Sequence, residues 1–287
     1  LAERTGVALD YEDLFSADHV PDLARRLCAR WAAAGQDAAD IPVSTADRGP
    51  ASVAQERFWF LQQLAPASAA YHLCGAYRIV GALRVDALGG AFEQLVRRHE
   101  ALRSVLRRGA DGLRQVVLPA PAWTLPVIDL RADPVQAQAR IEADFAQPFD
   151  LAHGPLLRTT LYRVADDAHL LSVTLHHLVA DGTSVEQLNR ELAQLYAAPI
   201  AGQPAALPAP AVRYLDYAQW QREQLALPAS AALVDYWRGA LADTAPLALP
   251  TDRPRPRLVS DRGGRVPFAW PAELSAQVRD LARGHSV

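Results

Sequence analysis

The 287-residue sequence contains no methionine and only two cysteines, Cys28 and Cys74. Two cysteines supply neither a disulfide framework nor a cysteine-rich metal site, and such low usage fits a reducing compartment. No apolar run reaches the roughly 18 residues that a membrane-spanning helix requires, and no signal-peptide pattern is present. We therefore expect a cytoplasmic protein without a membrane partner. The lack of a methionine even at position 1 indicates a processed, excised or fragmentary chain.

An excess of positive charge is also missing. The 29 Lys and Arg residues stand against 32 Asp and Glu residues, which gives a formal net charge of -3. The arginines are scattered along the sequence, so they do not form the basic stripe that is typical of a nucleic-acid-binding surface. The sequence therefore gives no reason to expect a nucleic-acid partner. Its length suffices for one large or two ordinary domains.

Hydrophobic patterning predicts a mixture of strands and helices. Strands are expected near residues 75–80, 102–106, 115–118, 156–164 and 169–177, and helices near residues 88–96, 135–145 and 185–195. A turn-like segment between the last two strands favours an antiparallel hairpin. A proline-rich loop is expected over residues 199–210, followed by helices that contain Trp220 and Trp237. We predict an α+β fold in which helices pack on a mostly antiparallel sheet.

The most informative segment is LHHLVADG, residues 175–182, because it places two histidines, an acid and a glycine where a strand should end. Alternation along residues 169–177 directs His176 and His177 to opposite faces of the sheet. A single metal ion requires its ligands on one side, so this alternation argues against a zinc site built from His176, His177 and Asp181. One histidine can then work in a cleft while the other is structural.

The residues after the histidines predict the start of a helix. Gly182 allows close backbone approach or a positive φ angle. Thr183 and Ser184, followed three residues later by Glu186 and Gln187, offer two overlapping capping boxes. The expected unit is a strand, a loop of catalytic character and an amphipathic helix.

The segment HHLVADG resembles the HHxxxDG motif of the condensation domains of nonribosomal peptide synthetases. Four further blocks resemble the family in its order and spacing: SVAQERFWFL at 52–61, RHEALRS at 98–104, FDLAHGPLLR at 149–158 and YLDYAQW at 214–220. Phe58 and Ser104 replace the leucine and threonine that are usual in the first two blocks. The resemblance covers nearly everything after about residue 41.

The resemblance implies a sandwich fold similar to that of chloramphenicol acetyltransferase, with the first lobe complete and the second only begun. Residues 1–31 resemble the end of an acyl or peptidyl carrier domain, and residues 32–50 are expected to form a linker. Residues 51–225 would form the N-terminal lobe, and residues 226–287 the crossover and the start of the C-terminal lobe. Without most of the second lobe, a polypeptide of these residues alone is expected to be inactive.

The activity implied by the resemblance is peptide-bond formation between two carrier-bound thioesters. His177 would be the catalytic histidine, acting as a general base or as a positioning hydrogen-bond acceptor, and His176 would face inward as structure. Gly182 lies at a helix N-terminus, whose N–H groups can assist an oxyanion. Asp181 is expected to shape the site through an ion pair with Arg98, or less readily with Arg103.

No metal and no cofactor held by the domain itself are expected, because the substrates arrive on the phosphopantetheine of carrier domains. The carrier serine is not in this chain, since neither Ser16 nor Ser44 lies in a GGxS-like context. The implied partners are the upstream and downstream carrier domains and an adjacent adenylation domain. Donor and acceptor amino acids are not readable from the sequence.

Other functions remain open. A catalytically silent recruitment module of the same fold would bind partner proteins, although such modules usually degrade the motif. Epimerising relatives keep the histidines but differ in the first two blocks, and heterocyclising relatives replace the histidines. Ester formation with a hydroxyl acceptor also remains open. A free-standing acetyltransferase of the chloramphenicol type is disfavoured by the carrier-like segment at residues 1–31.

Overall fold

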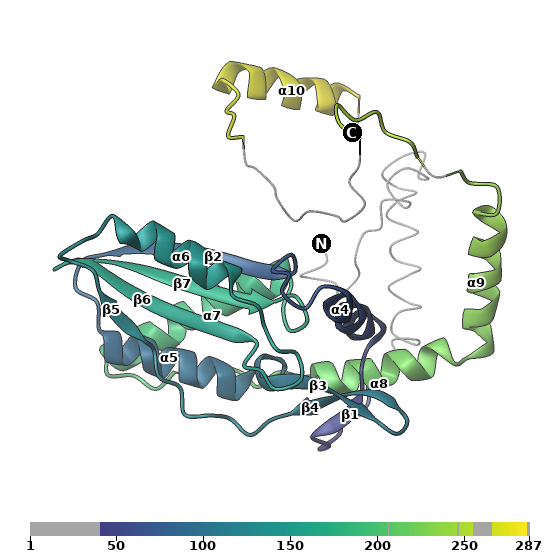
Figure 1. Ribbon diagram of the computed structural model, residues 1–287, viewed down its shortest axis with the longest axis horizontal. Coiled ribbons are helices and arrows are strands. Elements are labelled where there is room, and N and C mark those ends of the chain that lie inside the picture. Colours follow the sequence, from purple (N-terminus) through teal and green to yellow (C-terminus); the bar gives the residue numbers. More distant parts are fainter. Residues whose placement is uncertain (1–40, 206, 246, 255–265, 286–287) are drawn as a thin grey trace.

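The computed structural model describes residues 41–205, 207–245, 247–254 and 266–285, and the predicted carrier-domain end at residues 1–31 lies outside them. A four-stranded sheet with helices on both faces lies beside a smaller three-stranded sheet (Figure 1). The predicted α+β arrangement is therefore confirmed.

The larger sheet has the strand order β2-β7-β6-β5, with bounds His72–Val80, Ala168–His176, Leu157–Ala165 and Val127–Asp129. β7 pairs antiparallel with both β2 and β6, and only the short β5 runs parallel to its neighbour β6. The predicted hairpin is confirmed, because β6 and β7 are joined directly and Leu157 pairs with Leu175. This pairing fixes the end of β7, and with it the position of the two histidines.

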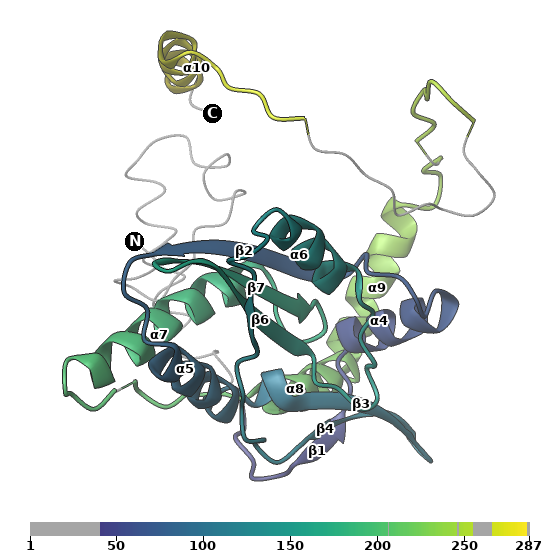
Figure 2. The same ribbon diagram turned by 60° about the vertical axis from the view of Figure 1, so that its left-hand side comes forward.

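Helices cover both faces of this sheet. On one face, α5 (Val85–Arg98) and α7 (Gly182–Ile200) pack side by side and enclose the main core. The core residues there are apolar and buried: Leu88, Ala91, Phe92, Leu95, Leu125, Leu161, Leu171 and Leu195. On the other face, α6 (Gln136–Ala146) places Ala137 and Ile141 against Tyr162. Helices thus lie on both faces of the sheet, as Figure 2 shows from a second direction, and the buried residues lie on the central strands β6 and β7.

The smaller sheet has the order β1-β4-β3, with bounds Arg48–Pro50, Gly112–Val117 and Ser104–Gly109. The short 3₁₀ helix η1 (Glu100–Arg103) precedes β3, and the helices α4 (Val53–Leu64) and α8 (Tyr214–Leu225) lie beside this sheet. A second core cluster joins it to the turn after β7: Ala51, Leu106, Phe149, Leu151, Leu156 and Leu178. The smaller sheet therefore supports the segment that contains His177.

Three predicted boundaries are wrong. The predicted linker 32–50 ends in β1, because Arg48–Pro50 pairs with β4 at a sheet edge, where a proline is tolerated. The strand predicted at 102–106 begins only at Ser104, since Leu102 lies in η1. The loop predicted from residue 199 starts later, because α7 continues through Pro199 to Ile200.

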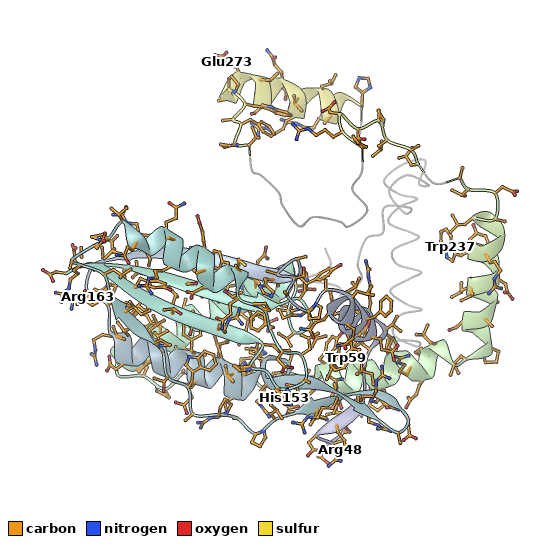
Figure 3. All side chains as sticks on the ribbon, viewed as in Figure 1. Arg48, Trp59, His153, Arg163, Trp237 and Glu273 are labelled. Carbon is orange, nitrogen blue, oxygen red and sulfur yellow. The ribbon has the colours of Figure 1, made fainter. Side chains whose placement is uncertain are left out.

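Two further helices, α9 (Pro228–Ala240) and α10 (Ala272–Gly284), contain no buried residue. Both helices expose large apolar side chains, including Trp237. Figure 3 shows Trp237 on α9, away from the two sheets. Within the described parts of the chain, no helix combines the length and the apolar character needed to cross a membrane.

Candidate active site

The candidate site is the short segment between β7 and α7. β7 ends at His176, which pairs with His72 of β2, and the next residue, His177, donates its backbone N–H to the Tyr71 carbonyl at 2.9 Å. The Val179 N–H closes the turn on the His176 carbonyl at 3.0 Å. His177 is held in place by its backbone, and its side chain is half-buried rather than enclosed.

Phe58 of α4 lies against both histidines. Its ring stacks on the His177 ring with a centroid separation of 5.9 Å and an interplanar angle of 18°. It meets the His176 ring edge to face at 5.8 Å and the Tyr71 ring at 5.2 Å. Among the residues that the structure describes, no side chain hydrogen-bonds to a ring nitrogen of His177. The stacked ring of Phe58 is thus the contact that orients this imidazole.

His176 has a different environment. It is 5% exposed, and its Nδ1 accepts a hydrogen bond from the Leu178 N–H at 2.9 Å, so its proton resides on Nε2. Burial lowers the pKa of His176 to about 4, and the neighbouring His72 and His177 act in the same direction. His176 is therefore a neutral, buried side chain, which agrees with the prediction that it faces inward.

Asp181 is the N-cap of α7. Its Oδ1 accepts hydrogen bonds from the Ser184 N–H at 2.8 Å and the Ser184 hydroxyl at 2.6 Å, and these bonds lower the pKa of Asp181. The predicted caps at Thr183 and Ser184 are wrong, because Asp181 already satisfies this end of the helix. Gly182 follows as the first residue of α7, and a Cβ there would meet nothing within 4 Å.

The predicted ion pair between Arg98 and Asp181 is also wrong. Arg98 instead binds Glu191 of α7 through Nε at 2.9 Å, and His99 Nε2 lies 2.6 Å from the same carboxylate oxygen. Arg103, the alternative partner, binds Glu100 and the Leu118 carbonyl. The second block of the motif set therefore ties α5 to α7 rather than holding the Asp181 carboxylate.

Glu191 was missed as a candidate from the sequence. Burial raises its pKa, but hydrogen bonds involving Gln187 and His99 and the Arg98 charge outweigh this effect, so the net shift is downward. A signal was present, because Glu191 lies at helical spacing from Leu188 and Leu195 on the apolar face of the predicted helix. A carboxylate on such a face requires a buried partner.

Tyr214 of α8 was also missed. Its hydroxyl lies 2.9 Å from the hydroxyl of Ser52, which caps α4, and burial raises the pKa of Tyr214. The negative charge of Asp181 contributes to the same upward shift, so the phenol lies near the start of α7. Arg222 of α8 adds two bonds to the Ala51 carbonyl at 2.9 and 2.8 Å. α8 thereby fixes the helix that presents Phe58.

An apolar cavity of about 780 Å³ opens between β2 and α7. Gly182 and Val185 form its wall at the start of α7, and Leu175, two residues before His177, lies in the same wall. The cavity thus begins next to the candidate site.

Within the described residues, no three His, Cys, Asp or Glu side chains are grouped so that they could hold a metal ion. His177 offers free ring nitrogens at a half-buried position, and α7, which begins five residues further along the chain, offers backbone N–H donors at its N-terminus. Such a pairing of a proton acceptor with oxyanion donors suits acyl transfer.

Comparison with known proteins gives consistent results. The family model described as the condensation domain matches residues 45–287. The phosphinothricin tripeptide synthetase PhsC of Streptomyces viridochromogenes is 42% identical over 259 residues, which are 88% of this chain and 24% of that protein. The chondramide synthase cmdD of Chondromyces crocatus is 39% identical over 251 residues, 86% of this chain and 6% of that protein. The chain thus spans a quarter or less of the length of these relatives.

Solved structures agree with the sequence relatives. The X-domain from teicoplanin biosynthesis superposes with a TM-score of 0.75 at 29% identity, covering 86% of this chain and 55% of that one. The starter condensation domain of rhizomide synthetase RzmA gives a TM-score of 0.64 at 29% identity, covering 70% of this chain and 49% of that one. The predicted fold, similar to chloramphenicol acetyltransferase, is confirmed by these neighbours.

Proposed function

This chain belongs to the condensation domain family of nonribosomal peptide synthetases, and from that premise we propose that it joins two carrier-bound substrates. The amine of a downstream aminoacyl thioester attacks the thioester carbonyl of an upstream acyl or peptidyl group. The new C–N bond replaces the C–S bond, and the amine proton is passed on to the thiol that leaves. The product is a peptide one residue longer on the downstream carrier.

The observation that carries this proposal is the environment of His177. Its ring nitrogens have no hydrogen-bond partner among the described residues, and Phe58 fixes its plane. The ring is therefore available to accept or orient the amine proton. The first N–H groups of α7, at Gly182 and Thr183, lack intrahelical partners by the geometry of a helix start, and they stabilise the oxyanion. Asp181 supports this arrangement by capping α7, and His176 supports it as a buried neutral ring.

The test is the substitution His177→Ala in the full synthetase with both carriers loaded. We expect that no peptide bond forms and that carrier loading is unchanged. Mass spectrometry of the product is the readout. His153→Ala is the matched control, because His153 is exposed and pairs only with Asp150 in the described structure. Wild-type turnover by the His177 variant would contradict the proposal.

We propose upstream and downstream carrier domains and an adenylation domain as partners. The relatives named above are synthetases many times longer than the matched segment, which supports a multidomain context. The substrates then arrive on phosphopantetheine, and the domain itself holds no cofactor. We also propose that these 287 residues alone do not catalyse condensation. The matched structures are about twice as long as the aligned part, and α9 and α10 bury no residue.

Partner binding without catalysis is a second candidate. The X-domain, which superposes well on this chain, is solved in complex with OxyB. In this chain His177, Asp181 and Gly182 all remain in place, which favours catalysis. The His177→Ala assay separates the two candidates, because a binding module would give no product in the wild type.

A further inference from the structure

The apolar cavity between β2 and α7 extends to residues that flank His177 along the chain. At its inner end, Leu73 and Leu175 face each other in the β2–β7 register, and Gly182 and Val185 form the wall from α7. The next pair in that register is His72 with His176, directly before His177. The inner end of the cavity therefore lies two residues along β7 from His177.

The lining is apolar along its length. Beyond the inner end, Ile79 of β2 and Leu192 and Tyr196 of α7 continue the wall. Residues 73 to 80 of β2 border the cavity, which at about 3.3 Å per strand residue corresponds to roughly 23 Å. The volume of about 780 Å³ falls in the range of sites that enclose small molecules.

Two polar residues of α7 also line the cavity, Glu186 beside Val185 at the inner end and Asn189 one turn further along the helix. Glu186 and Asn189 are exposed on α7, and Asn189 donates a hydrogen bond to the Tyr77 hydroxyl of β2 at 3.2 Å. Gly75 makes room for this tyrosine, because a Cβ at Gly75 would lie 2.9 Å from the Tyr77 ring. The hydrogen bond between Tyr77 and Asn189 links β2 to α7 across the lining of the cavity.

We propose that this cavity holds the apolar substituent of one carrier-bound substrate while its reacting carbonyl or amine lies at His177. The inference rests on the proposed function and adds the substrate class: an aliphatic or aromatic side chain, or an acyl chain. An anionic substituent is excluded, because the lining carries no positive charge, its one charged residue is the carboxylate Glu186, and an unpaired charge in an apolar space is strongly disfavoured. The cavity is not explained as a packing defect, because voids in protein cores are small.

The first experiment uses the full synthetase with carriers loaded by choice. In one arm the donor carrier bears glycyl, leucyl, phenylalanyl or aspartyl groups, and in the other arm the acceptor carrier bears them. We expect kcat/KM for leucyl to exceed that for glycyl at least tenfold in one arm, and aspartyl to fall below glycyl. The arm that shows the preference identifies which substrate occupies the cavity.

The second experiment fills the cavity from α7. Val185→Phe at the inner end should reduce the preference for leucyl over glycyl to less than threefold. Ala193→Phe, about 12 Å further along the helix, should spare leucyl and reduce the rate of a longer octanoyl group at least tenfold. Ala197→Phe is the matched control on the same helix, since Ala197 is exposed and does not line the cavity; we expect no change from it.

Two results would overturn the inference: equal rates for leucyl and glycyl in both arms, or a leucyl preference that survives Val185→Phe. Condensation of glycyl substrates shows separately that the proposed function holds. An enzyme that joins no substrate at all, glycyl included, would contradict the proposed function itself.

Discussion

At the scale of single residues, Phe58 is the side chain that determines the plane of the His177 ring. An aromatic pair of this geometry contributes about 1 kcal/mol beyond its buried area, which corresponds to roughly fivefold in rate if the orientation matters only in the transition state. We therefore expect Phe58→Leu to lower kcat about fivefold with KM unchanged. Phe60→Leu on the same helix, where the side chain is 62% exposed, is the control. Steady-state kinetics that show wild-type kcat for Phe58→Leu would refute this role.

His176 should make stability depend on pH. Its pKa is about 4 in the folded protein and about 6.5 when unfolded, so the unfolded chain binds more protons between these values. The resulting contribution, about 3 kcal/mol, is fully present above pH 6.5 and is lost as the pH falls towards 4. In His176→Gln, whose amide oxygen can accept the Leu178 N–H without titrating, the free energy of unfolding should fall less over this range. Parallel pH curves for both proteins would contradict the assignment.

Asp181 should matter for stability as the cap of α7. Asp181→Ala removes the acceptor of the Ser184 N–H and should lower the free energy of unfolding by about 1 kcal/mol. Asp181→Ser keeps an N-cap oxygen and should recover most of this loss. Chemical denaturation measures both variants, and an alanine variant as stable as wild type would show that Asp181 serves chemistry instead.

At the scale of elements, the charge cluster of Arg98, His99 and Glu191 joins α5 to α7. The Arg98 and Glu191 side chains are 16% and 11% exposed, so their hydrogen-bonded pair is poorly screened by solvent. Arg98→Ala should therefore lower the free energy of unfolding by about 1–3 kcal/mol. Arg97→Ala removes an exposed pair with Glu93 and should change it by less than about 0.5 kcal/mol. Equal effects of the two substitutions would show that the cluster does not hold α7.

The sequence was sufficient to predict elements whose signal is local. The alternation before His177 and the turn residues after β6 predicted the hairpin that positions the histidines. The strand end and helix start around Gly182 followed from the same stretch. Local patterns work here because period-two burial and helix capping each depend on residues a few positions apart.

Features that depend on distant pairing were not predictable in this way. Arg98 lies 93 positions from Glu191. From the sequence alone, several other carboxylates are equally possible ion-pair partners of Arg98. The sequence pattern predicted caps at Thr183 and Ser184, because both begin a capping-box spacing, whereas the backbone makes Asp181 the N-cap. The bond between Tyr214 and Ser52 joins two motif blocks whose mutual position is set only by the packing of α8 on the smaller sheet.

At the scale of the whole molecule, the two sheets support different parts of the candidate site. The larger sheet with α5 and α7 provides the cavity and the strand that ends in the histidines. The smaller sheet with α4 and α8 supports the turn after β7 and presents Phe58. His177 lies where the two meet.

The most direct test of this account follows one turnover in the full synthetase by intact mass of each carrier domain. The account predicts that the upstream carrier loses its acyl group while the downstream carrier gains the same mass, and that His177→Ala abolishes this transfer. Release of the acyl group without a gain on the downstream carrier, or undiminished transfer by the His177 variant, would contradict it.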